Sequence, residues 1–213
     1  MSTRPGADAT PSSRHRFIDR ATELRGIRRD GVNALIWRRA QSEELQAQAR
    51  TLVAQEPGLK LDLQGRPDQI RTGLLEAAGA RPFDIHQLAL DVEHLAQNFA
   101  VVAHSVILRA QLEVVESQPC PLFHVDQLQL RMLCTYVGAG TEYVDDRHGD
   151  RSRLGRGDND GVLAGHPPLQ VAPNHVILMK GERFPGVAGA AAIHRSPAQR
   201  AGEPRLVLRL DNA

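Results

Sequence analysis

Cysteine is scarce in this sequence, since the 213 residues contain only Cys120 and Cys134. Two cysteines are too few for a disulfide scaffold in a chain of this length, so a hydrophobic core must hold the fold together. An excess of charge is also lacking, because 26 basic residues nearly balance 25 acidic ones. A net charge of +1 gives no general attraction to nucleic acid or to an anionic membrane, and we expect neither as a partner.

Long apolar runs are missing from the N-terminus. Residues 1–15 are polar and contain Pro, Gly and Ser, which is typical neither of a signal peptide nor of a membrane span. We expect them to form a disordered tail on a cytoplasmic protein. Hydrophobic residues make up 41% of the chain and charged residues 24%, ordinary values for a globular protein, so residues 16–213 are expected to form one domain.

The first part of this domain, about residues 16–104, carries mainly helical patterns. The clearest begins at the potential cap Asp84, after which apolar residues recur at steps of three and four. Ser42 offers an N-cap for an earlier helix. The sequence predicts a strand at 32–37 and helices at about 42–57, 68–78 and 84–102.

The second part, about residues 105–213, has the patterns of strands separated by glycine-containing turns. The charged segment 145–161 is expected to be a solvated surface loop. The order of elements predicts an α+β fold in which N-terminal helices pack on a C-terminal antiparallel double-stranded β-helix of the jelly-roll or cupin kind. Strands are predicted at 108–114, 128–137, 176–180, 190–194 and 205–211.

The segment Phe123-His124-Val125-Asp126 places an imidazole and a carboxylate two residues apart, just before a predicted strand. Side chains at i and i+2 of a strand point to the same face, so His124 and Asp126 can converge on one metal ion. His194 is the favoured third ligand, because the apolar approach at 190–193 would place it inside the domain. Two histidines and one carboxylate are the ligand set of non-haem iron(II) sites. A hydrogen-bonded core histidine is the alternative role for His194, and His175 is a reserve ligand.

Cys120 leaves a second metal chemistry open. Its thiolate could complete a closed tetrahedral Zn(II) site with His124, Asp126 and His194. The chain would then be a zinc-binding protein of metal homeostasis without redox chemistry, or, with a bound water in place of the thiolate, a zinc hydrolase. A small buried hydrophobic residue is the favoured role for Cys120, and a metal-free module that binds an anion or a protein partner also remains open.

Arg205 is a candidate anion anchor. The segment 205–211 turns its leucines to one face and Arg205 and Arg209 to the other. A guanidinium inside a β-barrel needs a carboxylate or an anionic ligand, and a 2-oxo acid cosubstrate would supply it. Arg131 and Lys180 are alternative anchors or buried ion-pair partners, and for Arg209 a solvated position is favoured.

Five motifs occur between Cys120 and Pro197: Cys120-Pro-x-Phe-His-Val-Asp126, Leu130–Tyr136, Gly138-x-Gly140-Thr141-Glu142, Lys180-Gly181-Glu182 and His194-Arg195-Ser196-Pro197. Together they resemble the bacterial family known as domain of unknown function 1826, whose members are similar to outlying jelly-roll oxygenases that use iron(II) and 2-oxoglutarate. The resemblance implies that His124, Asp126 and His194 bind the metal and that Arg205 binds the cosubstrate. Val207 departs from the Ser or Thr usual two residues after that arginine. The substrate would be a small molecule or a protein, and this architecture allows a homodimer.

Overall fold

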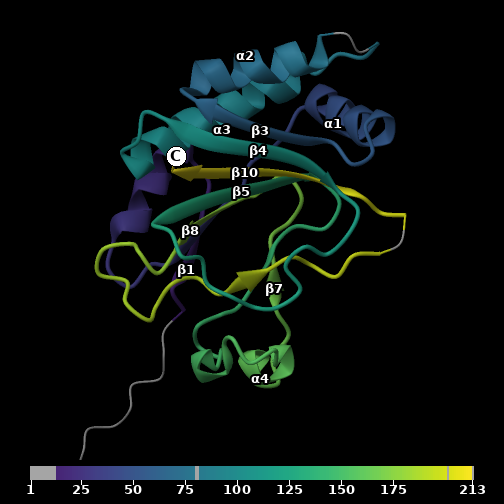
Figure 1. Ribbon diagram of the computed structural model, residues 1–213. Helices are drawn as coiled ribbons and strands as arrows, with labels where there is room; N and C mark the ends of the chain where they lie inside the picture. Colours follow the sequence, from purple (N-terminus) through teal and green to yellow (C-terminus); the bar gives the residue numbers. More distant parts are fainter. Residues whose placement is uncertain (1–12, 80–81, 201, 213) are drawn as a thin grey trace, which may run out of the picture.

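The computed structural model describes residues 13–79, 82–200 and 202–212 (Figure 1). Its helices are η1 (Ala21–Arg28), α1 (Glu43–Gln55), α2 (Pro67–Ala78), α3 (His86–Ala103), η2 (Arg151–Arg153) and α4 (Asn159–Leu163). Its strands are β1 (His15–Ile18), β2 (Ala34–Trp37), β3 (Lys60–Gly65), β4 (Leu108–Val115), β5 (Leu130–Val137), β6 (Glu142–Tyr143), β7 (Leu169–Gln170), β8 (Val176–Lys180), β9 (His194–Arg195) and β10 (Arg205–Asn212).

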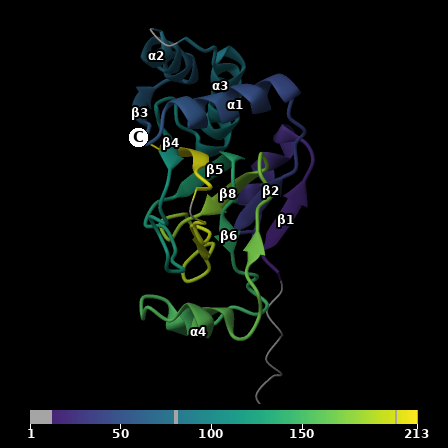
Figure 2. The same ribbon diagram turned by 90° about the vertical axis from the view of Figure 1, so that its right-hand side faces the viewer.

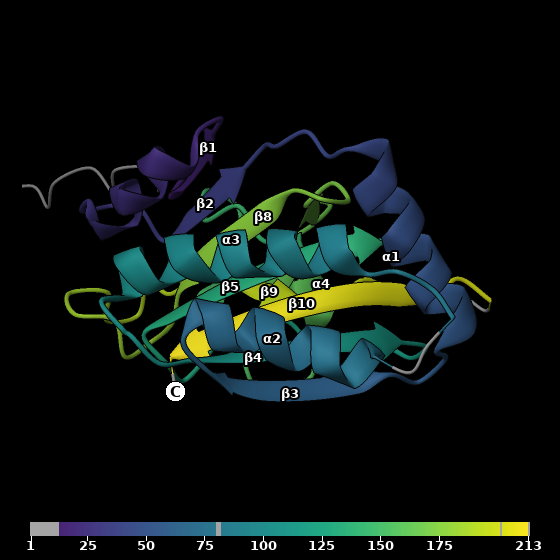
Figure 3. The ribbon, with the colours of Figure 1, turned by 90° about the horizontal axis from the view of Figure 1, so that it is seen from above.

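Seven strands form a large sheet in the order β1-β2-β8-β5-β10-β4-β3, in which every neighbouring pair except β1 and β2 is antiparallel. Helices α1, α2 and α3 cover one face of this sheet, as the view from above shows (Figure 3). A three-stranded sheet, β7-β6-β9, lies on the other side (Figure 1). The short helix α4 lies beyond the small sheet, at the end of the molecule away from α1–α3 (Figure 2).

The core between helices and sheet follows from the apolar stripe of α3. Leu88, Leu95 and Phe99 have no exposed surface and belong to the same cluster as the leucines of β10. Each fully buried side chain of this size contributes about 1.5–3 kcal/mol relative to an exposed one. The alternation predicted for 205–211 is therefore confirmed, since Leu206, Leu208 and Leu210 face the helices.

Ser42 is confirmed as the cap of α1, since its hydroxyl accepts a hydrogen bond from the Leu45 amide at 3.1 Å. The predicted cap Asp84 is wrong, because α3 begins at His86 and its N-cap residue is Ile85; the Asp84 carboxylate nevertheless accepts a hydrogen bond from the His86 amide at 2.8 Å. Pro67 opens α2, where its missing N–H costs nothing, and Gly79 follows the last residue of that helix. Among the described residues, no helix combines the length and the apolarity needed to cross a bilayer.

The α+β class is confirmed, but strands also occur in the part expected to be helical. β2 coincides with the predicted strand at 32–37, whereas β1 and β3 were not expected and form the two edges of the large sheet. Residues 1–12 of the expected tail lie outside the described chain, while His15 already belongs to β1. Of the strand predicted at 190–194, only His194 belongs to a strand, β9. The expected loop at 145–161 contains η2 and the start of α4.

Candidate metal centre

His124 and His194 are held opposite each other by their own backbones. Each amide donates to the other residue's carbonyl at 3.0 Å, which makes an isolated antiparallel bridge at the edge of the small sheet. Directly opposed residues of an antiparallel pair project to the same side. The two imidazole rings accordingly lie side by side, with centroids 4.5 Å apart.

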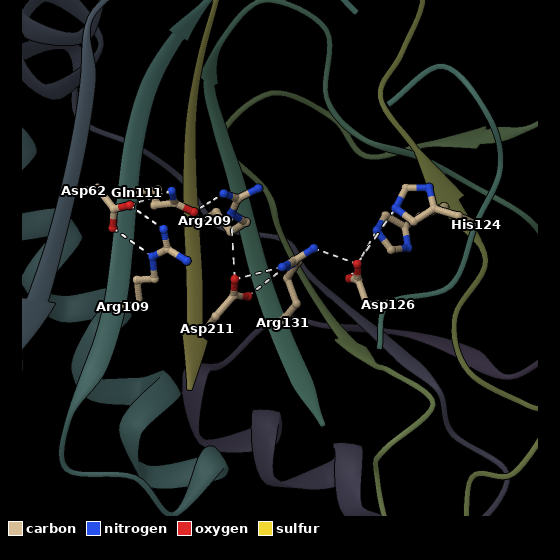
Figure 4. A network of polar contacts seen from close by, with 9 residues as sticks. Asp62, Arg109, Gln111, His124, Asp126, Arg131, Arg209 and Asp211 are labelled. Atoms are coloured by element: carbon tan, nitrogen blue, oxygen red, sulfur yellow. Dashed lines mark hydrogen bonds and ion pairs between the residues drawn. The ribbon is translucent and has the colours of Figure 1, made fainter. Parts of the chain in front are cut away.

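Asp126 brings a carboxylate to the same point. One potential ligand atom from each of His124, Asp126 and His194 lies within 4.8 Å of the other two (Figure 4). The Glu182 amide, just after β8, donates to the Asp126 carbonyl at 2.8 Å. Gly181 permits this approach, because a Cβ there would lie 2.2 Å from the Leu128 carbonyl oxygen. The end of β8 therefore fixes the backbone that carries the carboxylate.

Each histidine directs its Nε2 toward Asp126. The Nδ1 of His124 lies 3.0 Å from the Leu122 carbonyl oxygen, and that of His194 lies 3.2 Å from the Ala192 carbonyl oxygen. A carbonyl only accepts, so each Nδ1 carries a hydrogen, and the neutral form of such an imidazole has its lone pair on Nε2. This orientation by a backbone carbonyl is common in metal-binding histidines.

The centre as built requires a positive charge. The Nε2 of His124 lies 3.8 Å from Asp126 Oδ1, and that of His194 lies 3.4 Å from Asp126 Oδ2, which is buried and has no hydrogen-bond partner among the described residues. Burial lowers the pKa of His194 to about 4, against the opposing pull of Asp126, so this imidazole is neutral near pH 7. The His194 lone pair then faces a carboxylate oxygen, an unfavourable arrangement that a bound cation would relieve.

The separations also suit a metal ion. Two ligand atoms about 2.1 Å from one ion and at right angles to each other are about 3 Å apart. The observed 3.4 and 3.8 Å are slightly longer, so a small inward movement of the rings would complete the geometry. Cys120 is exposed, so its favoured role as a small buried hydrophobic residue is wrong. Neither Cys120 nor His175 is part of this set of three.

Arg131 supports the carboxylate rather than a free anion. Its Nη1 donates to Asp126 Oδ1 at 2.6 Å, while its Nε and Nη2 form a two-point ion pair with Asp211 at 2.7 and 2.8 Å. From Asp211 the polar contacts continue across the sheet through Arg209 and Gln111 to Asp62 (Figure 4). Arg131 is thus the ion-pair partner that the sequence offered as one of its two roles.

Arg205 lies on the same side of the sheet and has no carboxylate partner among the described residues. It is 4% exposed, its guanidinium donates to the Gln199 side chain at 3.3 Å and to the Ala139 carbonyl at 3.5 Å, and burial lowers its pKa. A Cβ on Gly138, whose φ is +83°, would come within 2.7 Å of the Arg205 side chain, so the close approach depends on glycine. A buried guanidinium without a counter-ion is prepared for an anionic ligand.

One cavity of about 130 Å³ connects these groups. Its lining includes His124, His194 and Arg205, together with Val207 and Thr141. Thr141 is buried and was not predicted as a site residue, although its position directly after the Gly138-x-Gly140 turn offered a signal. Asp211 was also missed, although it continues the alternation that turns Arg205 and Arg209 toward this side.

Lys180 is the predicted site residue that this cavity does not contain. Its ammonium donates to the Arg29 carbonyl at 3.2 Å and lies 4.6 Å from the centre of the Phe184 ring. It lines a different cavity, near the N-terminal end of the described chain. The structure therefore brings together His124, Asp126, His194, Arg131 and Arg205, and separates Lys180 from them.

Comparison with solved structures finds proteins of similar architecture at low identity. The Arabidopsis thaliana dioxygenase for auxin oxidation 1, in a complex with 2-oxoglutarate, is 14% identical over 90% of this chain and 86% of its own, with a TM-score of 0.48. AviO1 from Streptomyces viridochromogenes is 12% identical over 90% and 94%, with a TM-score of 0.46. HygX from Streptomyces hygroscopicus, with iron bound, is 13% identical over 85% and 82%, with a TM-score of 0.45.

These likenesses are weak, so the site is interpreted from the residues of this chain alone. No curated protein matches the sequence. A family model, in contrast, matches residues 19–211, which include every residue of the candidate metal centre. The chain belongs to the family described as "Protein of unknown function (DUF1826)".

Proposed function

We propose that this protein is a non-haem iron(II) oxygenase that uses 2-oxoglutarate, built on a variant of the jelly roll. The observation that carries the proposal is the convergence of the Nε2 atoms of His124 and His194 on the two oxygens of the Asp126 carboxylate, of which Oδ2, facing His194, is buried and has no hydrogen-bond partner in the described chain. His124, Asp126 and His194 would be the metal ligands. Two histidines and a carboxylate with open positions favour iron(II) over a closed zinc site.

The protein's own groups would orient the metal and the cosubstrate. Iron(II) and a chelating 2-oxo acid supply the oxidation chemistry when they are bound. The backbone carbonyls of Leu122 and Ala192 hold the two imidazoles in the required tautomer. Arg131 donates to Asp126 Oδ1 and fixes the rotation of the carboxylate.

Arg205 would hold the distal carboxylate of the cosubstrate. It is buried, has no carboxylate partner in the described chain, and lines the cavity that the two histidines also line. Val207, which stands where a hydroxyl is usual, can donate no hydrogen bond. The buried Thr141 lines the same cavity, and its hydroxyl makes no hydrogen bond among the described residues, so we assign the missing hydrogen bond to Thr141.

The first test measures the metal and the cosubstrate together. Protein purified without an affinity tag should contain iron or take up one Fe(II) per chain, and anaerobic addition of 2-oxoglutarate should produce a weak visible charge-transfer band. His124→Ala and His194→Ala should lose both the iron and the band. His175→Ala is the matched control and should keep both, because His175 lies outside the cluster.

A second pair of variants tests the cosubstrate end. Arg205→Met should bind iron normally but require far more 2-oxoglutarate to form the band, and Thr141→Val should show a smaller change in the same direction. If wild-type protein with Fe(II) gave neither the band nor turnover of 2-oxoglutarate, the proposal would be refuted.

A further inference from the structure

A second cavity, of about 250 Å³, lies around the end of β8 and contains a buried lysine. Its lining shares no residue with the cavity of the candidate metal centre. The polar and charged residues that line it are Arg14, Arg28, Asp30, Asn33 and Lys180, and its apolar wall includes Val32, Phe184, Pro185, Val187 and Ala190.

Lys180 is poorly compensated in this cavity. The residue is only 6% exposed, and among the described residues its ammonium has one hydrogen bond, to the Arg29 carbonyl, and a contact with the Phe184 ring. No carboxylate lies within ion-pairing distance in the described part of the chain. An ammonium has three donors, so burial here leaves hydrogen-bonding capacity unused.

The rest of the lining adds positive charge. Arg14 makes no side-chain hydrogen bond or ion pair within the described residues, and Arg28 donates to the Val102 carbonyl at 2.7 Å, which leaves its charge unpaired as well. Asp30 is the single acidic residue of the lining. With Lys180 protonated, the cavity carries two more positive than negative charges, and an anion would balance them.

We propose that this cavity binds a compact organic anion, a carboxylate or a phosphate, with Lys180 as its main anchor and Arg14 as a second one. The ring of Phe184 and the side chain of Val187 would contact a small apolar part of the ligand. The cavity volume is slightly below the range of about 300–1,000 Å³ usual for small-molecule sites, which fits a small ligand.

The backbone connects this site to the candidate metal centre. The Lys180 carbonyl accepts from the Ala192 amide at 3.0 Å, and the Ala192 carbonyl is the acceptor that orients His194. Two residues beyond Lys180, the Glu182 amide holds the Asp126 carbonyl. An occupant of the cavity would thus contact the segment that positions two of the three candidate ligands.

The test titrates anions calorimetrically into protein carrying Arg205→Met, which removes the other buried cation available to an anion. Inorganic phosphate and benzoate are the probes, because they represent the two ligand chemistries. We expect at least one to bind, and Lys180→Met added to this background should weaken that binding about tenfold or more. Lys60→Met is the matched control, since Lys60 is exposed on β3 and should leave binding unchanged.

A second variant guards against a folding defect in Lys180→Met. Arg14→Gln removes the positive charge of a side chain that makes no hydrogen bond in the described chain. The variant protein should therefore fold normally and bind the anion severalfold more weakly. Failure of both probes to bind, or an affinity that neither Lys180→Met nor Arg14→Gln changes from that of the Arg205→Met background, would overturn the proposal. These outcomes do not depend on iron, so they are separate from the test of the metal centre.

Discussion

Strand β5 separates two buried charged clusters of opposite character. On the helix-covered face, Arg39 forms a two-point ion pair with Asp91 at 2.5 and 2.8 Å, and the Tyr136 hydroxyl donates to the same carboxylate at 2.8 Å. The Arg39 Nε donates to the Asn174 carbonyl, which completes the set. On the opposite face, Arg131 pairs with Asp126 and Asp211, yet Asp126 Oδ2 has no hydrogen-bond partner in the described chain.

The difference separates a stabilising cluster from a binding site. A buried network whose hydrogen bonds are all made rigidifies the fold and has nothing left to bind with. A buried acceptor without a hydrogen-bond partner and a buried guanidinium without a counter-ion both lower the stability of the folded protein. A ligand that pairs with them offsets this loss of free energy. We therefore expect substitutions in the Arg39 cluster to change stability, and substitutions around Asp126 to change metal binding.

The largest expected effect is on the cluster of Arg39, Asp91 and Tyr136, which we call the closed cluster. Asp91→Ala leaves the buried Arg39 guanidinium without its carboxylate and should lower the free energy of unfolding by about 3–5 kcal/mol. Chemical denaturation measures this loss. Tyr136→Phe removes one hydrogen bond and should cost about 1 kcal/mol. If iron affinity fell in the folded Tyr136→Phe protein, the two clusters would not be separable as described.

In the cluster around Asp126, which we call the open cluster, a substitution should change iron affinity far more than stability. Asp126→Asn keeps the shape of the side chain but removes its charge, and we expect iron affinity to fall by more than about 100-fold, beyond the usual effect of supporting residues. The free energy of unfolding of the metal-free protein should change by less than about 1 kcal/mol, because Arg131 keeps its pair with Asp211. Metal titration and denaturation of the same sample measure both quantities. A loss of stability as large as that of Asp91→Ala would contradict the distinction.

A supporting residue should have an intermediate effect. Asp211 holds Arg131, which holds Asp126, so Asp211→Asn should reduce iron affinity about tenfold without removing a ligand. Asp62→Asn is the matched control at the exposed end of the same chain of contacts and should leave the affinity unchanged. Equal affinities for wild type and Asp211→Asn would show that Arg131 needs no support from Asp211.

Sequence patterns predicted the helices, the long strands and the convergence of His124, Asp126 and His194. Local rules suffice there, because caps, apolar stripes and the i, i+2 alternation act over a few residues. They could not predict that β1 and β3 complete the large sheet, because strand pairing depends on distant partners. For the same reason the sequence could not separate Lys180 from Arg205, although both are basic residues on apolar strands and both are buried.

The smallest expected effect is a difference in thiol reactivity between the two cysteines, one in the closed cluster and one beside the open cluster. Cys134 belongs to the closed cluster, where burial raises the pKa of its thiol to about 11, whereas Cys120 is exposed beside the open one. A thiol-reactive alkylating reagent at about pH 8 should therefore label only Cys120 in the folded protein and both cysteines after denaturation. Mass spectrometry of the labelled peptides distinguishes them, and Cys120→Ala is the control that should abolish native labelling.

The same labelling decides how Cys120 relates to a metal. Because Cys120 is not among the three converging residues, Fe(II) or Zn(II) should bind without consuming its thiolate. Labelling of Cys120 should then remain complete in metal-loaded protein, at a rate changed only by crowding in the shared cavity. Full protection by Zn(II), lost in His124→Ala, would instead show a closed tetrahedral site with a thiolate ligand. Such a site leaves no position for a cosubstrate, so this one measurement separates oxygenase chemistry from a zinc site.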